Sequence, residues 1–168
     1  MTMRTKIALV AATFFTLISC NQKVAPTQDV KVLDLYTIEV PGTFAPMQEL
    51  YPDADIQYGN TFKQMYLVTV HQDKNKTANF EEYVKQSLAS YNKRENYEII
   101  VQEDVRINGI PGKKYELLMS QDKDMMYMIQ VILDGKKANY QYITWTTGQN
   151  KEAQKDNFLN TLASFKEQ

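Results

Sequence analysis

The sequence contains one cysteine, one histidine and one tryptophan among its 168 residues. A single cysteine excludes a disulfide within the chain. Conventional zinc sites use several histidine or cysteine ligands, so one of each disfavours such a site. His71 is not accompanied by a Gly-x-Ser-x-Gly motif, which disfavours a serine hydrolase of that type. We therefore interpret His71 as a surface residue at the end of a strand.

The chain also lacks an excess of basic residues, with 19 Lys and Arg against 20 Asp and Glu. Nucleic-acid binding depends on clustered positive charge, so no nucleic-acid partner is expected. Hydrophobic residues make up 43% of the sequence, which is ordinary for a globular protein. A chain of this length can bury a sizeable core, and it favours a single domain.

The N-terminus is organised as an export signal. Arg4 and Lys6 precede a 12-residue apolar stretch, residues 7–18, which is followed by Ser19. A basic segment, an apolar segment and a small residue at the cleavage position are typical of a signal peptide. Twelve helical residues rise about 18 Å, too short for a hydrocarbon core of about 30 Å. We expect residues 1–19 to be removed as a signal peptide, which leaves 17 basic and 20 acidic residues.

The segment Leu17-Ile18-Ser19-Cys20 resembles the bacterial lipobox. The resemblance implies that Cys20 receives a diacylglyceryl group and becomes an acylated N-terminus. The alternative is an ordinary secretory signal with a chance cysteine. Two or more acyl chains hold a protein stably on a bilayer, so we expect a lipid anchor in the bacterial cell envelope. Asn21 differs from the Asp of the inner-membrane retention signal, which favours the outer membrane.

After the signal, the sequence predicts a tether and then one domain. Residues 20–34 are mostly polar and lack clear apolar periodicity, so we expect a flexible tether that extends on the order of 40 Å. A single globular domain is expected over residues 35–168. Short runs of apolar residues, several of them alternating, predict strands near residues 36–40, 56–60, 63–71, 97–107, 114–120, 125–133 and 138–146. Helical spacing predicts helices near residues 80–91 and 150–165.

The grouping of these elements predicts the fold class. Four predicted strands follow one another with short connections, which indicates an antiparallel meander. Strands and helices are segregated and do not alternate, which is typical of an α+β protein. We expect a central antiparallel sheet of about six or seven strands flanked by helices.

Four segments resemble the PsbP-like superfamily, in particular the bacterial lipoproteins grouped with DcrB. They are residues 36–41 (Tyr-Thr-Ile-Glu-Val-Pro), the helix at residues 80–91, residues 105–112 (Val-Arg-Ile-Asn-Gly-Ile-Pro-Gly) and residues 162–165 (Leu-Ala-Ser-Phe). The resemblance covers about residues 35–166 and implies an αβα sandwich. Its motifs form turns and core, so it implies little about activity. Members from photosynthetic organisms assist photosystem assembly and have been linked to metal ions, but no metal-binding positions match here.

Several residues are candidates for binding. Met119, Met125, Met126 and Met128 are close in sequence, and thioethers bind Cu(I) or pack in cores. Tyr140, Tyr142 and Trp145 suit either a stacking platform or cross-strand packing. We take Met126, Met128, Tyr140 and Tyr142 as a candidate binding surface. Asp53 and Asp55 form only a fragment of a calcium loop, and we expect no metal or cofactor.

These observations support three hypotheses about function. The first is a non-enzymatic binding or assembly module, held at the envelope through Cys20, that engages a protein or a small ligand. The second is an envelope glycan hydrolase with paired carboxylates, although no spacing in the sequence marks a pair. The third is a metal-handling lipoprotein that uses the methionines or Asp53 and Asp55. We favour the first, because no catalytic set is recognisable.

Overall fold

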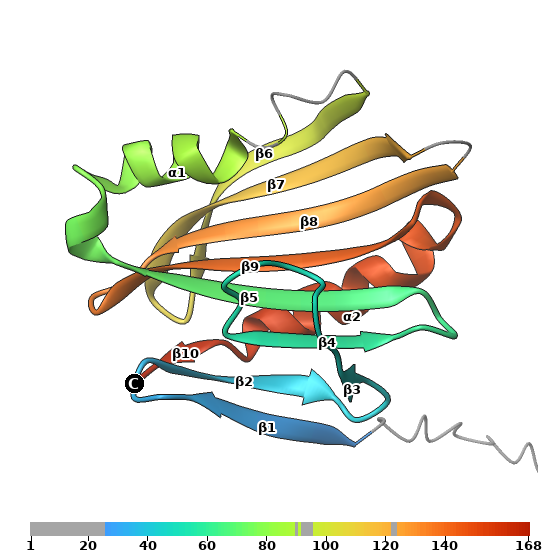
Figure 1. The fold of residues 1–168 in the computed structure, drawn as a ribbon, viewed down its shortest axis with the longest axis horizontal. Coiled ribbons are helices and arrows are strands. Elements are labelled where there is room, and N and C mark those ends of the chain that lie inside the picture. Colours follow the sequence, from blue (N-terminus) through green and yellow to red (C-terminus); the bar gives the residue numbers. More distant parts are fainter. Residues whose placement is uncertain (1–25, 90, 92–95, 122–123) are drawn as a thin grey trace, which may run out of the picture.

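The computed structural model describes residues 26–89, 91, 96–121 and 124–168. They form strands and helices in the order shown in Figure 1. The first half contains β1 (Thr27–Val32), β2 (Tyr36–Pro41), β3 (Ala45–Pro46), β4 (Ile56–Asn60), β5 (Met65–Asp73) and α1 (Phe80–Leu88). The second half contains β6 (Tyr97–Ile107), β7 (Ile110–Gln121), β8 (Asp124–Asp134), β9 (Ala138–Thr147), α2 (Lys151–Ala163) and β10 (Lys166–Glu167). Short 3₁₀ helices lie at Lys74–Lys76 and Gly148–Asn150.

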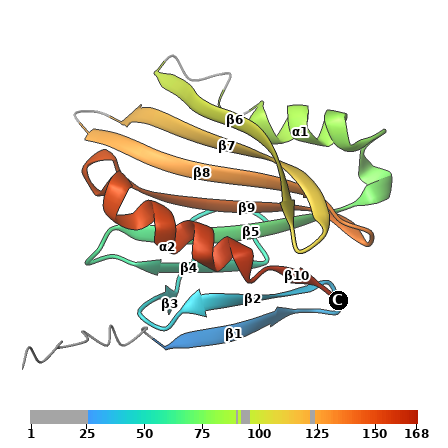
Figure 2. The same ribbon diagram turned by 180° about the vertical axis from the view of Figure 1, so that it is seen from behind.

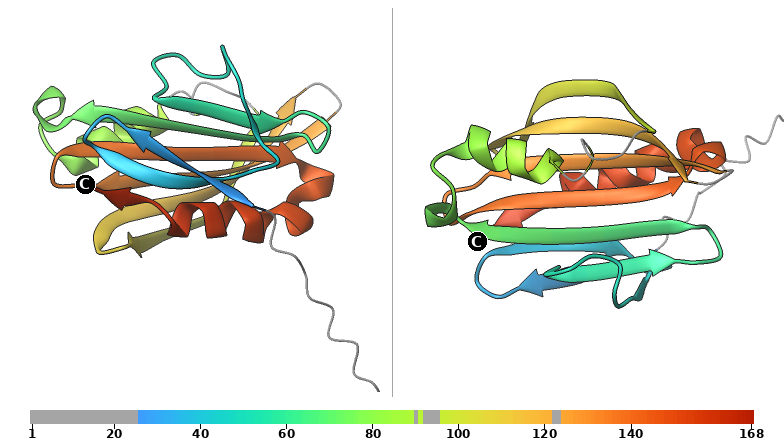
Figure 3. Two further views of the ribbon diagram at one scale, coloured as in Figure 1. Left: turned by 90° about the horizontal axis from the view of Figure 1, so that it is seen from below. Right: turned by 45° about the horizontal axis from the view of Figure 1, so that its top comes forward.

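The described strands form two antiparallel sheets. The larger has seven strands in the order β3-β4-β5-β9-β8-β7-β6, and the smaller has three in the order β1-β2-β10. Helix α1 covers part of one face of the large sheet, and α2 crosses the opposite face beside the small sheet (Figures 2 and 3). The predicted α+β class and the central sheet between helices are therefore confirmed.

Two hydrophobic clusters fill the two sides of the large sheet. On the α2 side, Tyr127, Ile129 and Val131 of β8 pack with Phe158 of α2 and Tyr36 of β2. The α1 side has its own cluster, which contains Tyr83 and Val84 of α1 with Leu117, Met128 and Ile132 of the sheet. Because the middle of β8 lies between covered faces, the seven successive residues from Tyr127 to Leu133 are all buried.

Local sequence signals explain several boundaries. The Asn79 side chain accepts a 2.9 Å hydrogen bond from the Glu82 backbone N–H and caps the start of α1. Asn108 and Gly109 both have positive φ, 46° and 88°, and they join β6 to β7 as a two-residue hairpin. That combination is the turn best matched to the twist of paired strands. The turn thus occupies residues 108 and 109 alone, and Pro111 lies within β7 just before its pairing with β8 begins at Gly112.

The structure corrects the expected N-terminal boundary of the domain. Thr27–Val32, assigned above to the flexible tether, forms strand β1 and pairs with Tyr36–Pro41. The strand at Tyr36–Pro41 in turn belongs to the small sheet and not to the central one. Cys20 and the signal peptide lie outside the described residues. None of the described helices is long and apolar enough to cross a membrane.

Candidate binding site

A pocket of about 480 Å³ opens on the α1 side of the large sheet, beyond the part that α1 covers. This volume lies in the range typical of small-ligand sites. Its lining comes from the loop between β3 and β4, from the turn between β4 and β5, and from strands β5, β8 and β9. The lining residues are Met47, Leu50, Gln64, Tyr66, Asp124, Met125, Met126, Trp145, Thr146 and Thr147.

The floor of the pocket consists of three half-buried side chains on adjacent strands. Tyr66 of β5 is the register partner of Trp145 of β9, and their rings stack with centroids 5.2 Å apart. Met126 of β8 pairs with Thr147 and lies two residues from Met128, the partner of Trp145. Directly paired residues of neighbouring strands point to the same face, as do residues two apart in one strand, so these side chains form a continuous apolar surface.

Met128 belongs to the same sheet face but is covered. Its thioether sulfur accepts a 3.2 Å hydrogen bond from the Tyr91 hydroxyl, and its exposure is only 8%. The residues around α1 therefore seal one end of the face, while Met126 and Trp145 stay accessible beyond it. The transition from covered to open sheet marks the boundary of the pocket.

One wall is the loop between β3 and β4, which is held by Gln57 of β4. The Gln57 side-chain oxygen accepts hydrogen bonds from the backbone N–H groups of Leu50 (2.6 Å) and Tyr51 (3.1 Å). The Gln57 backbone carbonyl accepts another from Met47 N–H at 2.8 Å. This wall is therefore formed before any ligand arrives, which lowers the entropy cost of binding.

Gly59 allows the wall to approach the floor. A Cβ atom at this position would lie 2.3 Å from Met47 Sδ and 2.9 Å from Tyr66 Cδ1. Only a residue without a side chain permits this close contact between β4, the loop and the Tyr66 ring. The shape of the pocket thus depends on one glycine.

The lining is chemically suited to an apolar or aromatic group. Tyr66 and Trp145 offer flat ring faces, and methionine thioethers adapt to irregular shapes. Gln64, Asp124 and Thr147 supply polar groups that can orient a bound molecule. Met125 is 46% exposed, an unusual exposure for a large apolar side chain in this molecule.

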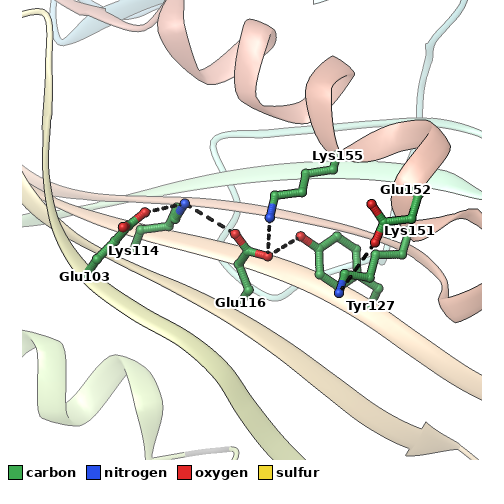
Figure 4. A network of polar contacts seen from close by, with 7 residues as sticks. All are labelled: Glu103, Lys114, Glu116, Tyr127, Lys151, Glu152 and Lys155. Carbon is green, nitrogen blue, oxygen red and sulfur yellow. Dashed lines mark hydrogen bonds and ion pairs between the residues drawn. The ribbon is translucent and has the colours of Figure 1, made fainter.

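A network of polar side chains lies on the other face of the large sheet, beneath α2, and centres on Glu116 of β7 (Figure 4). The Glu116 side chain is 1% exposed. Its Oε2 accepts hydrogen bonds from the Tyr127 hydroxyl (2.6 Å) and Lys155 Nζ (2.9 Å). Lys114 Nζ lies 3.3 Å from Oε1 and also contacts Glu103 Oε1 at 2.5 Å.

This network keeps Glu116 ionised. Burial on its own would raise the pKa of Glu116, but the hydrogen bonds from Tyr127 and Lys155 and the contact with the Lys114 ammonium group outweigh it and hold the pKa below its usual value. Burial, together with the hydrogen bond to Glu116, raises the pKa of Tyr127. An ionised acceptor with its donors in place links α2, through Lys155, to the sheet. We interpret the network as an attachment of α2 and not as a reaction centre.

His71 is paired with one of the aspartates considered as calcium ligands. His71 Nδ1 lies 2.6 Å from Asp55 Oδ1, and the Tyr36 hydroxyl donates to Asp55 Oδ2 at 2.9 Å. Asp53 is exposed, with a positive φ of 57°. The Asp55 carboxylate thus already accepts bonds from within the protein. Across the described part of the chain, no cluster of three or more His, Cys, Asp and Glu residues is placed to hold a metal ion.

A further pocket, at the turn between β8 and β9, contains two acids, Asp134 and Glu167. Glu167 accepts hydrogen bonds from the backbone N–H groups of Lys136 (2.8 Å) and Lys137 (2.7 Å) and from the Tyr140 hydroxyl. Burial tends to raise the pKa of Glu167, but these bonds lower it overall. Asp134 is paired with Lys74. A glycosidase needs one carboxyl group with a raised pKa, and Glu167 is perturbed in the opposite direction.

No family model matches the sequence, and no curated protein matches it either. Solved structures do match. The cyanobacterial PsbP (CyanoP) of Synechocystis superposes with a TM-score of 0.65 at 14% identity, over 90% of this chain and 99% of that one. The chain has the PsbP-like fold.

Two other structures share the fold. LpqN of Mycobacterium tuberculosis, described as involved in cell envelope biogenesis, matches with a TM-score of 0.60 at 9% identity, over 84% of this chain and 85% of that one. The Ran-binding protein Mog1p of Saccharomyces cerevisiae matches with a TM-score of 0.57 at 10% identity, over 84% of this chain and 95% of that one. The predicted PsbP-like resemblance is confirmed at the level of the fold, while the narrower resemblance to DcrB stays a prediction.

The PsbP-like fold separates the four residues of the candidate surface. Met126 lines the pocket, and Met128 lies on the same face beneath Tyr91. Tyr140 and Tyr142 are each 1% exposed and belong to the cluster on the opposite face. The surface as predicted is therefore wrong for the two tyrosines, because alternate residues of β9 face α2 and the small sheet.

Sequence reasoning missed seven lining residues of the pocket, namely Met47, Leu50, Gln64, Tyr66, Asp124, Thr146 and Thr147. Trp145 was identified as a possible stacking residue, and the structure gives it a different aromatic partner from those expected. Tyr66 and Trp145 are brought together by the pairing of β5 with β9, a long-range contact that no local pattern reveals. Met119 is 2% exposed and lies in the α1-side core.

Proposed function

We propose that this protein is an exported lipoprotein, anchored through Cys20 in the bacterial cell envelope, that acts as a non-enzymatic binding or assembly module. The Tyr66–Trp145 pocket is its contact site for an apolar group of a small ligand or a partner protein. The observation that carries the proposal is the stacked, half-buried aromatic pair beside Met126, open beyond α1 and walled by a preformed loop.

The comparisons support this proposal by analogy of fold. LpqN is described as involved in cell envelope biogenesis, and Mog1p as a Ran-binding protein. Fold analogy is a weak guide to function, so the pocket remains the stronger argument. The notable carboxylates, Glu116 and Glu167, both have lowered pKa values and bonds from neighbouring groups, which suits structural roles.

The anchor is tested by membrane flotation of the full chain beside a Cys20→Ser variant. The proposal predicts that the wild-type protein floats with vesicles and resists extraction by salt, because several acyl chains bind stably. The variant should keep its signal peptide and lose the acylated mature form on mass spectrometry. Density-gradient separation of the membranes then tests the outer-membrane location that Asn21 favours.

The binding role is tested by recovery of the protein from chemically crosslinked envelopes. We expect a defined partner or ligand with the wild-type protein and its loss with Met126→Glu, which places a charge on the pocket floor. Leu33→Glu is the matched control, because Leu33 is 70% exposed and does not line the pocket. Equal recovery from the two variants, or no specific partner at all, would count against the pocket as the contact site.

A further inference from the structure

The first residues that the structure describes, Pro26 and Thr27, are already hydrogen-bonded to the body of the domain. The Pro26 carbonyl accepts a 2.7 Å hydrogen bond from Gly42 N–H, and Thr27 pairs with Pro41 in the small sheet. Pro26 is six positions after Cys20. Six residues span at most about 20 Å when fully extended. An acylated Cys20 therefore confines this end of the domain to within about 20 Å of the bilayer.

The same end carries the most exposed large apolar side chain of the described residues. Phe62, in the turn between β4 and β5, is 96% exposed. Figure 1 shows this turn and the start of β1 at one end of the molecule, with the turn between β1 and β2 at the other. A shared pocket of about 310 Å³ is lined by both Thr27 and Lys63, which confirms that the turn and the N-terminal strand are neighbours.

The turn is ordered in a way that holds Phe62 outward. Asn60 Oδ1 accepts a 2.9 Å hydrogen bond from Lys63 N–H, and Asn60 Nδ2 donates to the Thr43 carbonyl at 2.9 Å. Gln64 has a positive φ of 52° and its N–H donates to the Thr61 carbonyl. Phe62 is thus presented on a braced turn, which lowers the entropy cost of inserting its ring elsewhere.

A second exposed apolar group lies near the turn. Met125, at the start of β8, is 46% exposed and lines the Tyr66–Trp145 pocket together with Gln64. Lys63, next to Phe62, adds a positive charge that anionic headgroups attract. An apolar ring flanked by a cation matches the chemistry of segments that lie in the bilayer interface.

We propose that the turn at residues 60–64 docks on the phospholipid bilayer that holds the acylated Cys20, with the Phe62 ring inserted among the headgroups. The domain then sits end-on, with its N-terminal end toward the membrane and the turn at Leu33 away from it. The Tyr66–Trp145 pocket opens beside the docked end, since Gln64 lines it. This inference rests on the proposed lipid anchor.

A spin label at residue 62 tests the docking. Cys20 is the only cysteine and is acylated in the anchored protein, so Phe62→Cys provides a single reactive thiol. The lipidated full chain carrying a nitroxide there is placed in vesicles of phosphatidylethanolamine and phosphatidylglycerol. Collision rates with oxygen, which concentrates in the bilayer, and with a polar nickel chelate, which stays in water, are then measured.

Leu33→Cys is the matched control. Leu33 is also an exposed apolar residue in a turn, and the six residues of β1 place it about 20 Å from Thr27. We expect a higher oxygen and a lower nickel collision rate at residue 62 than at residue 33. Removal of the vesicles by detergent should abolish the difference.

Three results would overturn the inference. Equal nickel collision rates at residues 62 and 33 in protein that floats with the vesicles would leave the anchor intact and refute the docking. Protection of residue 62 from both reagents would indicate contact with protein and not with lipid. Failure of the wild-type chain to float would refute the anchor itself, and the docking that depends on it.

Discussion

The phenol ring of Tyr66 on β5 lies stacked against the indole of Trp145 on β9, with 18° between their planes. The two residues are direct register partners. Aromatic pairs of this kind contribute about 0.5–1.5 kcal/mol beyond the burial of their area. Trp145 is the only tryptophan, so its fluorescence reports on the pocket floor without interference from other indoles.

Gly59→Ala should disturb this floor. The added Cβ would meet Met47 Sδ and the Tyr66 ring, so either the wall or the ring must move. We expect a loss of about 1 kcal/mol in the free energy of unfolding and a changed Trp145 emission maximum. Urea titration followed by tryptophan fluorescence measures both.

The double variant Met47→Ala/Gly59→Ala serves as the control for this mechanism. Removing the Met47 thioether eliminates the shortest contact, so the emission maximum should return part of the way to that of Met47→Ala alone. If Gly59→Ala had the same stability and emission maximum as the wild-type protein, the close approach of Met47 and Tyr66 to Gly59 would not shape the pocket.

Tyr140→Phe and Tyr142→Phe should weaken the fold and leave binding unchanged. The Tyr142 hydroxyl donates to the Phe158 carbonyl at 2.7 Å, and the Tyr140 hydroxyl donates to Glu167 at 2.8 Å. Loss of each hydrogen bond costs about 1 kcal/mol. Thermal unfolding measures the first effect and partner recovery from envelopes measures the second. A loss of binding at normal stability would return these tyrosines to the contact site.

Glu116→Gln should remove part of the acid sensitivity of the fold. The folded pKa of Glu116 lies below its unfolded value, so its contribution to stability is present above about pH 4.3 and is lost as the pH falls further. The variant leaves Lys114 and Lys155 without their buried partner, which costs about 3 kcal/mol at neutral pH. Urea titrations between neutral pH and pH 3 measure both effects.

Glu103→Gln is the matched control for that variant. Glu103 also contacts Lys114, but its side chain is 51% exposed. An exposed ion pair contributes about 1 kcal/mol or less, so the control should lose little stability. Similar losses in the two variants would contradict a special role for the buried carboxylate in holding α2.

Much of the fold follows from local pattern. The apolar run at residues 125–133, the strand pattern at residues 138–146 and the helical spacing after Asn79 predicted elements close to those observed. Strand β1 was missed because its sequence, Thr-Gln-Asp-Val-Lys-Val, is largely polar and is ordered by pairing with β2. The two residues of β10 pair with Tyr36 and Thr37, almost the whole length of the domain away, which no local pattern reveals.

The site was less predictable than the fold. Alternation separates Tyr140 and Tyr142 from Trp145, since odd and even residues of one strand face opposite sides. Which side stays open depends on where α1 ends and on how α2 and the small sheet pack. The partnership of Tyr66 with Trp145 depends on strand order, in which β9 lies between β5 and β8.

The most direct test of the central claim is site-specific photocrosslinking from the pocket in living cells. A photoreactive phenylalanine derivative replaces Met126 in the full-length protein, and the same derivative at Gln102, exposed on β6, is the control. The proposed function predicts a defined adduct from residue 126 that is absent from residue 102 and is reduced by Gly59→Ala. No adduct, or the same adducts from both positions, would contradict a binding role for the Tyr66–Trp145 pocket.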